Sequence, residues 1–259
     1  MNKKISLFGC GWLGEPLAYS LIKKGYSVNG STTSESKIST FVSGGINAFI
    51  LSLENLSDQI SSFLSAEILI VAIPSKNIEG FKQLISFIEK STIKKIIFIS
   101  STSVYHNSED IITENNPLKE CDLANIEQLF HKNPNSETTI IRFAGLFGYQ
   151  RKPAFFFKNG RPIPNPEGYV NMIHRDDCIN IIEQILLQNI WNEVFNACAD
   201  SHPTRRDFYT KAFSDCNLEL PVFKENENRT IKIVSNQKLK NLLNYKFKYA
   251  NLLIMQLCS

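Results

Sequence analysis

A glycine-rich turn near the start of the chain has the residue types and spacing of a phosphate-binding loop. Three glycines spaced G-x-G-x-x-G follow a short uncharged apolar run at residues 5–8, and a helical pattern comes next. In such a turn the first glycine permits a tight bend, the second lets the backbone approach a pyrophosphate, and the third lets the helix pack closely. We expect the turn to bind a dinucleotide through Gly9, Gly11, Trp12, Leu13 and Gly14. The alternative is a glycine turn that forms for conformational reasons alone.

Hydroxyl groups follow the second predicted strand, at residues 26–31. In sites that prefer NAD, a carboxylate about twenty residues past the glycines binds the ribose 2′-hydroxyl. This chain instead has Ser31, Thr32, Thr33 and Ser34 there, with Lys37 just beyond. Hydroxyls and a cation suit a 2′-phosphate, which a carboxylate would repel. The stretch therefore predicts NADP, with NAD as the alternative; a solvated helix cap is the competing interpretation, above all for Lys37.

Candidates for chemistry with a substrate come from the fifth predicted strand, at residues 94–106. Ser101 and Tyr105 lie near its carboxyl end, and the phenol of Tyr105 is suited to exchanging a proton with a substrate hydroxyl. The alternative for Tyr105 is packing, with a buried ring and a hydrated hydroxyl. A cofactor that crosses the strand ends is expected to contact Ala72, Ile73, Pro74 and Ser100.

Strands that alternate with helices must position these side chains. Strands are predicted at residues 46–53, 66–77 and 94–106, and helices at 56–65, 78–91 and 121–130. The run at 66–77 is apolar over most of its length, as in strands buried on both faces of a parallel sheet. This alternation predicts an α/β fold of Rossmann type, with a doubly wound parallel sheet.

Length, composition and charge limit the class of protein. The chain has 259 residues, of which 43% are hydrophobic and 20% charged, and a net charge of +3. The length allows one large domain or two small ones, and the charge is too small to indicate nucleic acid. Neither an apolar run of membrane-spanning length nor a signal-peptide pattern is present. We therefore expect a cytoplasmic protein whose partner is a small molecule rather than a nucleic acid or a membrane.

Cysteine and histidine give no sign of a metal site. The six cysteines include no C-x-x-C pair, and the four histidines lie far apart. This pattern favours reduced, mostly buried thiols over disulfides, and it predicts no metal centre.

Several stretches together resemble the extended short-chain dehydrogenase/reductase superfamily, which includes NAD-dependent epimerases and dehydratases. They are IIFISSTSVYHN, TIIRFAGLFGYQR, KNGRPIPNPEGYVNMIHRDDC, EVFNACADSHPTRRDF and SNQKLKNLLNYKFKYANLL. The resemblance implies an NAD(P)-binding Rossmann domain at residues 1–150, to which 171–200 return, and a small C-terminal substrate lobe at 151–170 and 201–259. It also implies a homodimer through helices at 78–91 and 121–131.

In the superfamily a serine or threonine of the fifth strand orients the substrate hydroxyl, and by position the resemblance implies that this residue is Ser101. The superfamily's reaction also uses a Tyr-x-x-x-Lys pair on the helix after the fifth strand. Residues 121–130, at the matching place, contain neither tyrosine nor lysine. The one such spacing in the chain joins Tyr19 to Lys23 on the first predicted helix, behind the phosphates. The chain therefore resembles an atypical branch without the pair, in which a proton path through Ser101 and Tyr105 or through water would make hydride transfer slow.

Two functions of different classes remain open. The first is an NAD(P)-dependent oxidoreductase or epimerase/dehydratase that acts on a sugar nucleotide or similar small metabolite. The second is a non-catalytic NADP-binding sensor or regulatory protein. A weaker third is a pocket that no longer binds a dinucleotide. For a substrate phosphate Arg161 is the better candidate, whereas Arg142 is expected in a surface or interdomain ion pair.

Overall fold

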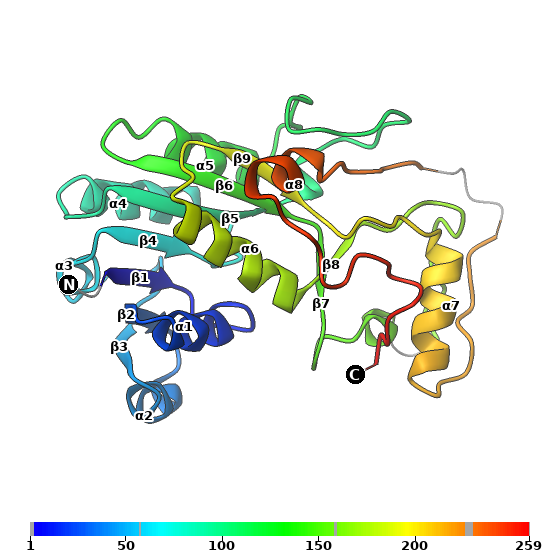
Figure 1. Ribbon diagram of the computed structural model, residues 1–259, viewed down its shortest axis with the longest axis horizontal. Helices are drawn as coiled ribbons and strands as arrows, with labels where there is room; N and C mark the ends of the chain where they lie inside the picture. Colours follow the sequence, from blue (N-terminus) through cyan, green and yellow to red (C-terminus); the bar gives the residue numbers. More distant parts are fainter. Residues whose placement is uncertain (1–2, 57, 158–159, 226–229, 259) are drawn as a thin grey trace. The chain divides into compact units, whose positions relative to one another are not determined.

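The computed structural model describes residues 3–56, 58–157, 160–225 and 230–258. Within them a seven-stranded sheet has the strand order β3-β2-β1-β4-β5-β6-β9 (Figure 1). The strands are β1 (Lys4–Phe8), β2 (Ser27–Thr32), β3 (Ile46–Ile50), β4 (Ile68–Val71), β5 (Lys95–Ser101), β6 (Glu137–Phe143) and β9 (Val194–Ala197). β1 pairs in parallel with β2 and β4, β2 with β3, and β4 with β5. This is the strand order of a doubly wound Rossmann fold, so the predicted fold class is confirmed.

Helices follow most of these strands. They are α1 (Gly14–Lys23), α2 (Ile38–Ser43), α3 (Ile60–Phe63), α4 (Ile78–Ile88), α5 (Asp122–His131), α6 (Arg175–Gln188), α7 (Arg205–Asp215) and α8 (Gln237–Leu243). Short 3-10 helices are η1 (Glu35–Lys37), η2 (Thr102–Val104) and η3 (Pro153–Phe156), and a second small sheet pairs β7 (Gly145–Phe147) with β8 (Met172–His174). The helix predicted at 56–65 is reduced to α3, and residue 57 lies outside the described residues.

Packing on both faces of the sheet explains why the central strand β4 is apolar throughout. Every residue of β4 is buried. On one face Phe8, Leu69 and Phe98 belong to a core that includes residues of α3, α4 and α5. The ring of Phe98 stacks on that of Phe130 in α5, with centroids 4.6 Å apart. Leu7 points to the opposite face, toward the start of α1.

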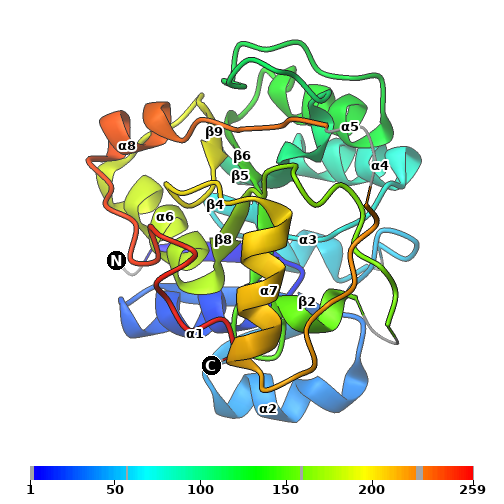
Figure 2. The ribbon, with the colours of Figure 1, turned by 90° about the vertical axis from the view of Figure 1, so that its right-hand side faces the viewer.

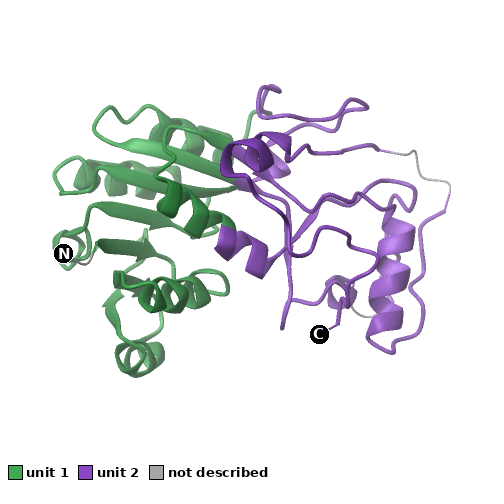
Figure 3. Ribbon diagram, in the orientation of Figure 1, with its two compact units in different colours: residues 1–100, 119–141, 181–194 green, residues 101–118, 142–180, 195–259 purple. Residues whose placement is uncertain are grey.

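Two compact units make up the chain, and Figure 3 colours them separately. The first contains residues 1–100, 119–141 and 181–194, and the second contains residues 101–118, 142–180 and 195–259. This division differs from the expected one, which grouped 1–150 with 171–200. The chain passes from one unit to the other within β5, β6, α6 and β9, and between Leu118 and Lys119.

In the second unit, α7 and the C-terminal segment, residues 245–258, share one apolar core. Figures 1 and 2 show the segment beside α7. Phe208 and Ala212 of α7 are fully buried in this core, as is Leu252 of the segment. Leu257 is also buried there, and its backbone amide donates a hydrogen bond to Asp215 Oδ2 at 2.8 Å. The segment is therefore part of the folded unit rather than a loose end.

A disulfide closes this arrangement, so the expectation that all cysteines are reduced is wrong at two positions. Cys216 follows α7, and it is bonded to Cys258 with 5.2 Å between the Cα atoms. The two residues are 42 positions apart, and they meet only because the C-terminal segment packs on α7. Spacing alone could not indicate the pair. The free cysteines are Cys10, Cys121, Cys178 and Cys198.

Replacing Cys216 by serine is expected to lower the free energy of unfolding by roughly 2–4 kcal/mol, because the unfolded chain loses a cross-link that spans 42 residues. Cys121→Ser, which removes a free thiol, is the matched control and should change it by less than about 0.5 kcal/mol. Urea unfolding followed by circular dichroism measures both, and a reductant should abolish the difference. Identical unfolding curves without reductant would contradict a stabilising cross-link.

Candidate functional site

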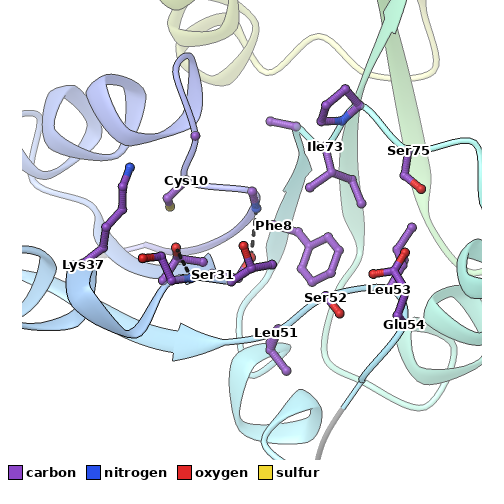
Figure 4. A pocket seen from close by; sticks show the side chains of 17 residues that line it. Phe8, Cys10, Ser31, Lys37, Leu51, Ser52, Leu53, Glu54, Ile73 and Ser75 are labelled. Carbon is purple, nitrogen blue, oxygen red and sulfur yellow. Dashed lines mark hydrogen bonds between the residues drawn. The ribbon is translucent and has the colours of Figure 1, made fainter.

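A pocket of about 380 Å³ lies at the carboxyl ends of β1 to β4 in the first unit. Four short stretches of chain, far apart in sequence, line it. They contribute Phe8, Gly9, Cys10, Gly11, Ser31, Thr32, Thr33, Ser34, Lys37, Leu51, Ser52, Leu53, Glu54, Ala72, Ile73, Pro74 and Ser75. Figure 4 shows Lys37 at one end, Glu54 and Ser75 at the other, and Phe8 and Ile73 between them. A doubly wound sheet places its ligand at this edge.

Close backbone approaches fix the glycine turn after β1. Gly9 has a φ of +106°, and a Cβ atom on it would lie 2.8 Å from the carbonyl oxygen of Ala72. Gly14 begins α1 directly against the carbonyl oxygen of Gly9, which a Cβ atom would overlap. Around a Cβ atom on Gly11, by contrast, there is no described atom within 4 Å. The turn itself needs Gly9 and Gly14, whereas Gly11 leaves space open at the pocket.

Hydrogen bonds hold the exit of β2 against this turn. The amide of Gly9 donates to Ser31 Oγ at 2.9 Å, and the amide of Cys10 donates to the Ser31 carbonyl oxygen at 2.8 Å. The amide of Ser34 donates to Thr32 Oγ1 at 3.1 Å. Both hydroxyl oxygens act as acceptors in these bonds, so each hydroxyl retains its own O–H to donate. The end of β2 thus presents donors to the pocket.

Among the described residues that line the pocket, Lys37 is the one with a positively charged side chain, and it forms an ion pair. Its Nζ lies 2.8 Å from Glu15 Oε2, in the first turn of α1, and 5.8 Å from the centroid of the Phe41 ring. Cys10 is close to both charges. Burial, reinforced by the Glu15 carboxylate, raises the pKa of Cys10 to about 12, so the thiol is neutral at physiological pH.

At the far end of the pocket, sequence reasoning missed Ser52 and Glu54. Ser52 and Glu54 follow β3, and Ser75 follows β4. Glu54 is exposed, and hydrogen bonds from its own backbone amide and from the Ser52 hydroxyl lower the pKa of its carboxyl group. A usable signal did exist, since the carboxyl ends of neighbouring parallel strands meet at one edge and both strands had been predicted.

The pocket brings together many but not all of the residues proposed for cofactor binding. Those that line it are Gly9, Gly11, Ser31, Thr32, Thr33, Lys37, Ala72, Ile73 and Pro74. Trp12, Leu13, Gly14 and Ser100 lie outside this lining. Leu13 is buried just before α1, and the buried Ser100 hydroxyl donates to Glu127 Oε1 in α5. Cofactor contacts from these four residues stay a prediction.

Ser101 and Tyr105, the residues predicted to be catalytic, belong to the second unit. Ser101 Oγ accepts a hydrogen bond from the amide of Ser103 at 3.1 Å and so caps η2. Tyr105 is only 2% exposed; its hydroxyl donates to Asn196 Oδ1 at 2.9 Å and accepts from Arg142 Nη1. Burial raises the pKa of Tyr105, although the Arg142 charge opposes this. The phenol is neutral and bonded on both sides, and its catalytic role stays a prediction.

Further polar contacts in the second unit fix the turn that carries these residues. Lys232 Nζ donates to the carbonyl oxygens of Thr102 at 2.7 Å and Tyr105 at 3.0 Å. The amide of Asn196 donates to Glu114 Oε1 at 2.7 Å. Sequence reasoning assigned nothing to Lys232 because its partners lie about 130 positions away. Arg142 is itself buried and donates to the Tyr105 hydroxyl, so it does not lie at a surface, which was one of the two places expected for its ion pair.

Acidic residues at the start of α6 anchor the C-terminal segment. The buried carboxylate of Asp177 accepts hydrogen bonds from the amides of Lys248 at 2.8 Å and Tyr249 at 3.0 Å, and from the Tyr245 hydroxyl at 2.7 Å. Asp176 accepts from Lys248 Nζ at 3.0 Å. The rings of His174 and Tyr249 lie with centroids 3.8 Å apart. This cluster joins segments of one unit, and its groups are engaged with each other.

Tyr105→Phe is expected to lower the free energy of unfolding by about 1–3 kcal/mol, because buried groups on Arg142 and Asn196 each lose a hydrogen bond. Tyr26→Phe is the control, since no hydrogen bond from the half-buried Tyr26 hydroxyl is found among the described residues. Chemical unfolding of both variants measures the difference. A Tyr105→Phe protein as stable as the control would show that the buried bonds contribute little.

Metal ligation and membrane insertion find no support in the described part of the chain. None of its clusters combines three histidine, cysteine, aspartate or glutamate side chains that could hold a metal ion. None of its helices is both long enough and apolar enough to cross a membrane.

Comparison with known proteins shows similarity to a family model and to solved structures. Residues 4–126 match the family model described as the NAD binding domain of 6-phosphogluconate dehydrogenase. The fold is similar to that of a putative NAD-dependent epimerase/dehydratase from Methylobacillus flagellatus, with a TM-score of 0.79, 22% identity and coverage of 96% of this chain and 94% of that one. It is also similar to the UDP-glucuronic acid 4-epimerase from Bacillus cereus in complex with NAD, with a TM-score of 0.76, 19% identity and 96% coverage of both chains.

These likenesses confirm, at the level of the fold, the resemblance to epimerase/dehydratase-like short-chain dehydrogenases. A curated relative extends it to the sequence. Protein YeeZ from Escherichia coli strain K12 is 30% identical over 98% of this chain and 99% of its own length. The chain therefore belongs to the family of Protein YeeZ and has the NAD-binding Rossmann fold.

Proposed function

We propose that the pocket binds the adenosine and pyrophosphate part of NADP, with NAD as the alternative cofactor. The observation that carries the proposal is the glycine turn at the carboxyl ends of the strands, where a Cβ atom on Gly11 would meet only open space. A pyrophosphate needs such a close approach to the backbone. The adjoining amides at the start of α1 carry the positive end of the helix dipole. The residues present thus fit a dinucleotide.

The preference for a 2′-phosphate rests on the exit of β2. The Ser31 and Thr32 hydroxyls retain donors, Thr33 and Ser34 follow them in the lining, and Lys37 supplies a positive charge. Hydroxyl and ammonium donors bind phosphate oxygens well, and in this lining the one acidic residue, Glu54, lies at the opposite end. Elsewhere in the lining, Leu51, Leu53 and Ile73 offer apolar surface for a base.

The proposed activity is that of an atypical oxidoreductase or epimerase/dehydratase acting on a sugar nucleotide or a similar small metabolite. Structural neighbours that bind NAD and act on UDP-glucuronic acid support this substrate class. A bound nicotinamide dinucleotide supplies a hydride donor or acceptor. Ser101 is the residue proposed to orient a substrate hydroxyl, and its Oγ is already fixed by the amide of Ser103. Tyr105 is the residue proposed to exchange a proton with that hydroxyl.

A second function of another class is favoured by the state of Tyr105. Its hydroxyl is buried and bonded to Asn196 and Arg142, and the Tyr-x-x-x-Lys pair is absent from residues 121–130. A chain that binds NADP tightly and transfers no hydride would act as a sensor or regulatory protein, in which cofactor occupancy selects a conformation.

Two further parts of the proposal concern the protein's setting. We propose a homodimer through α4 and α5, which pack together in the first unit with the rings of Phe81 and Phe130 at 5.8 Å. A cytoplasmic location is also proposed. The Cys216–Cys258 disulfide is unusual for that compartment, so its redox state in the cell is informative.

Gly11→Ala is expected to weaken NADPH binding by at least tenfold in calorimetric titration, because a methyl group would occupy the space that a pyrophosphate requires. The variant should unfold within about 0.5 kcal/mol of wild type, since that methyl group touches nothing in the described protein. Gly14→Ala is the contrast, and it should destabilise the fold because its Cβ overlaps the Gly9 carbonyl oxygen. NADPH affinity unchanged in Gly11→Ala would contradict the proposed site.

Ser101→Ala is expected to lower NADPH-dependent turnover by about 10- to 100-fold, without weakening NADPH binding, if Ser101 orients the substrate hydroxyl. The control is Ser103→Ala. Ser103 is exposed, and the alanine variant keeps the backbone amide that donates a hydrogen bond to Ser101 Oγ. Oxidation of NADPH across a panel of sugar nucleotides and carbonyl compounds measures turnover. Wild-type binding without turnover on any of them would support the sensor instead.

A further inference from the structure

The fold brings the Glu15 carboxylate close to Lys37, at the end of the pocket proposed to bind a phosphate. The lining residues that follow β2 include no carboxylate of their own. Glu15 stands in the first turn of α1, and its Oε2 lies 2.8 Å from Lys37 Nζ. Lys37 is the cation among the described lining residues, and 22 positions separate the pair. Glu15 itself does not line the pocket, so it reaches a ligand there through Lys37.

This contact bears directly on the choice between NADPH and NADH, because the two cofactors differ only in a 2′-phosphate. Lys37 offers that phosphate a positive charge, but the ion pair with Glu15 already neutralises much of it. The side chains of Lys37 and Glu15 are 42% and 28% exposed, so solvent screens the interaction and limits its size. The pyrophosphate and the base are common to both cofactors, so the difference must be made here.

We propose that Glu15 is a specificity-determining residue that limits the preference for NADPH by holding Lys37 in an ion pair. The inference rests on the proposed binding of a nicotinamide dinucleotide in this pocket. It goes further by naming the residue that sets the cofactor ratio. Without Glu15, Lys37 and the hydroxyls of residues 31–33 would select strongly for NADPH. With Glu15 in the ion pair, the pocket binds both NADPH and NADH.

Calorimetric titration with NADPH and with NADH, at low and at physiological ionic strength, tests this in four proteins. They are the wild type, Glu15→Gln, Lys37→Gln and the double variant. Glu15→Gln should tighten NADPH binding by about threefold to tenfold and leave NADH unchanged, because Lys37 is released toward the 2′-phosphate. Lys37→Gln should weaken NADPH selectively. In the Lys37→Gln background the Glu15 substitution should have no further effect, because Glu15 acts through Lys37.

A matched control separates this contact from a change in net charge. Glu79 and Lys82 form an ion pair of 2.7 Å on the surface of α4, with side chains 76% and 53% exposed. Glu79→Gln removes the same charge away from the pocket lining, and it should alter neither affinity. Thermal unfolding of each variant identifies any loss of fold, and Glu15→Asp, which retains the charge on a shorter side chain, should give a cofactor ratio between those of wild type and Glu15→Gln.

The outcomes distinguish this inference from the function on which it rests. If the wild type and all variants bind neither cofactor, the proposed function fails. If they bind but Glu15→Gln leaves NADPH affinity unchanged, the inference fails alone. It is also overturned if Glu15→Gln tightens NADPH and NADH equally, since Glu15 would then act on the shared pyrophosphate, or if the effect persists in the Lys37→Gln background.

Discussion

The close approach of three backbone segments at the glycine turn is the constraint on which the first unit depends. Gly14 begins α1 against the carbonyl oxygen of Gly9, and Gly9 in turn lies against the carbonyl oxygen of Ala72 at the exit of β4. Any side chain at Gly9 or Gly14 would separate these segments. Because the segments touch, the ends of β1 and β4 and the N-terminus of α1 converge, and a pocket forms at one edge of the sheet. The apolar core beneath it keeps the strands in register.

The polar groups of this pocket are arranged before any ligand is considered. Ser31 ties the exit of β2 to the glycine turn through two hydrogen bonds, and Thr32 orders the turn that follows. The positive charge of Lys37 and the negative charge of Glu54 stand at opposite ends. A site whose donors are held in place by neighbouring backbone loses little conformational entropy on binding. That economy suits a cofactor better than a loose surface groove would.

The second unit uses its polar residues differently. The Tyr105 hydroxyl, a carboxylate of Asp177 and the ammonium of Lys232 all bind groups of their own unit. Buried polar groups need such partners, because an unpaired one costs free energy. Asp177 and the Cys216–Cys258 bond hold the C-terminal segment to the rest of the unit. The buried hydroxyl of Tyr105, which is expected to carry chemistry, therefore belongs to a network that also maintains the fold of the second unit.

Features that depend on local spacing could be predicted from the sequence. The period of apolar residues predicted the alternating strands and helices, and the glycine spacing predicted the turn after β1, since each follows from the conformations of a few consecutive residues. The absence of a Tyr-x-x-x-Lys pair after the fifth strand could also be read directly.

Contacts between segments far apart in the chain became visible only in the tertiary structure. It brought Glu15 to Lys37, added Ser52 and Glu54 to the pocket, joined Cys216 to Cys258 and buried the Tyr105 hydroxyl on Arg142 and Asn196. It also drew the boundary between the units inside strands that the sequence presents as continuous. The physical reason is that such contacts are set by the register of the sheet and by packing, which no local pattern encodes.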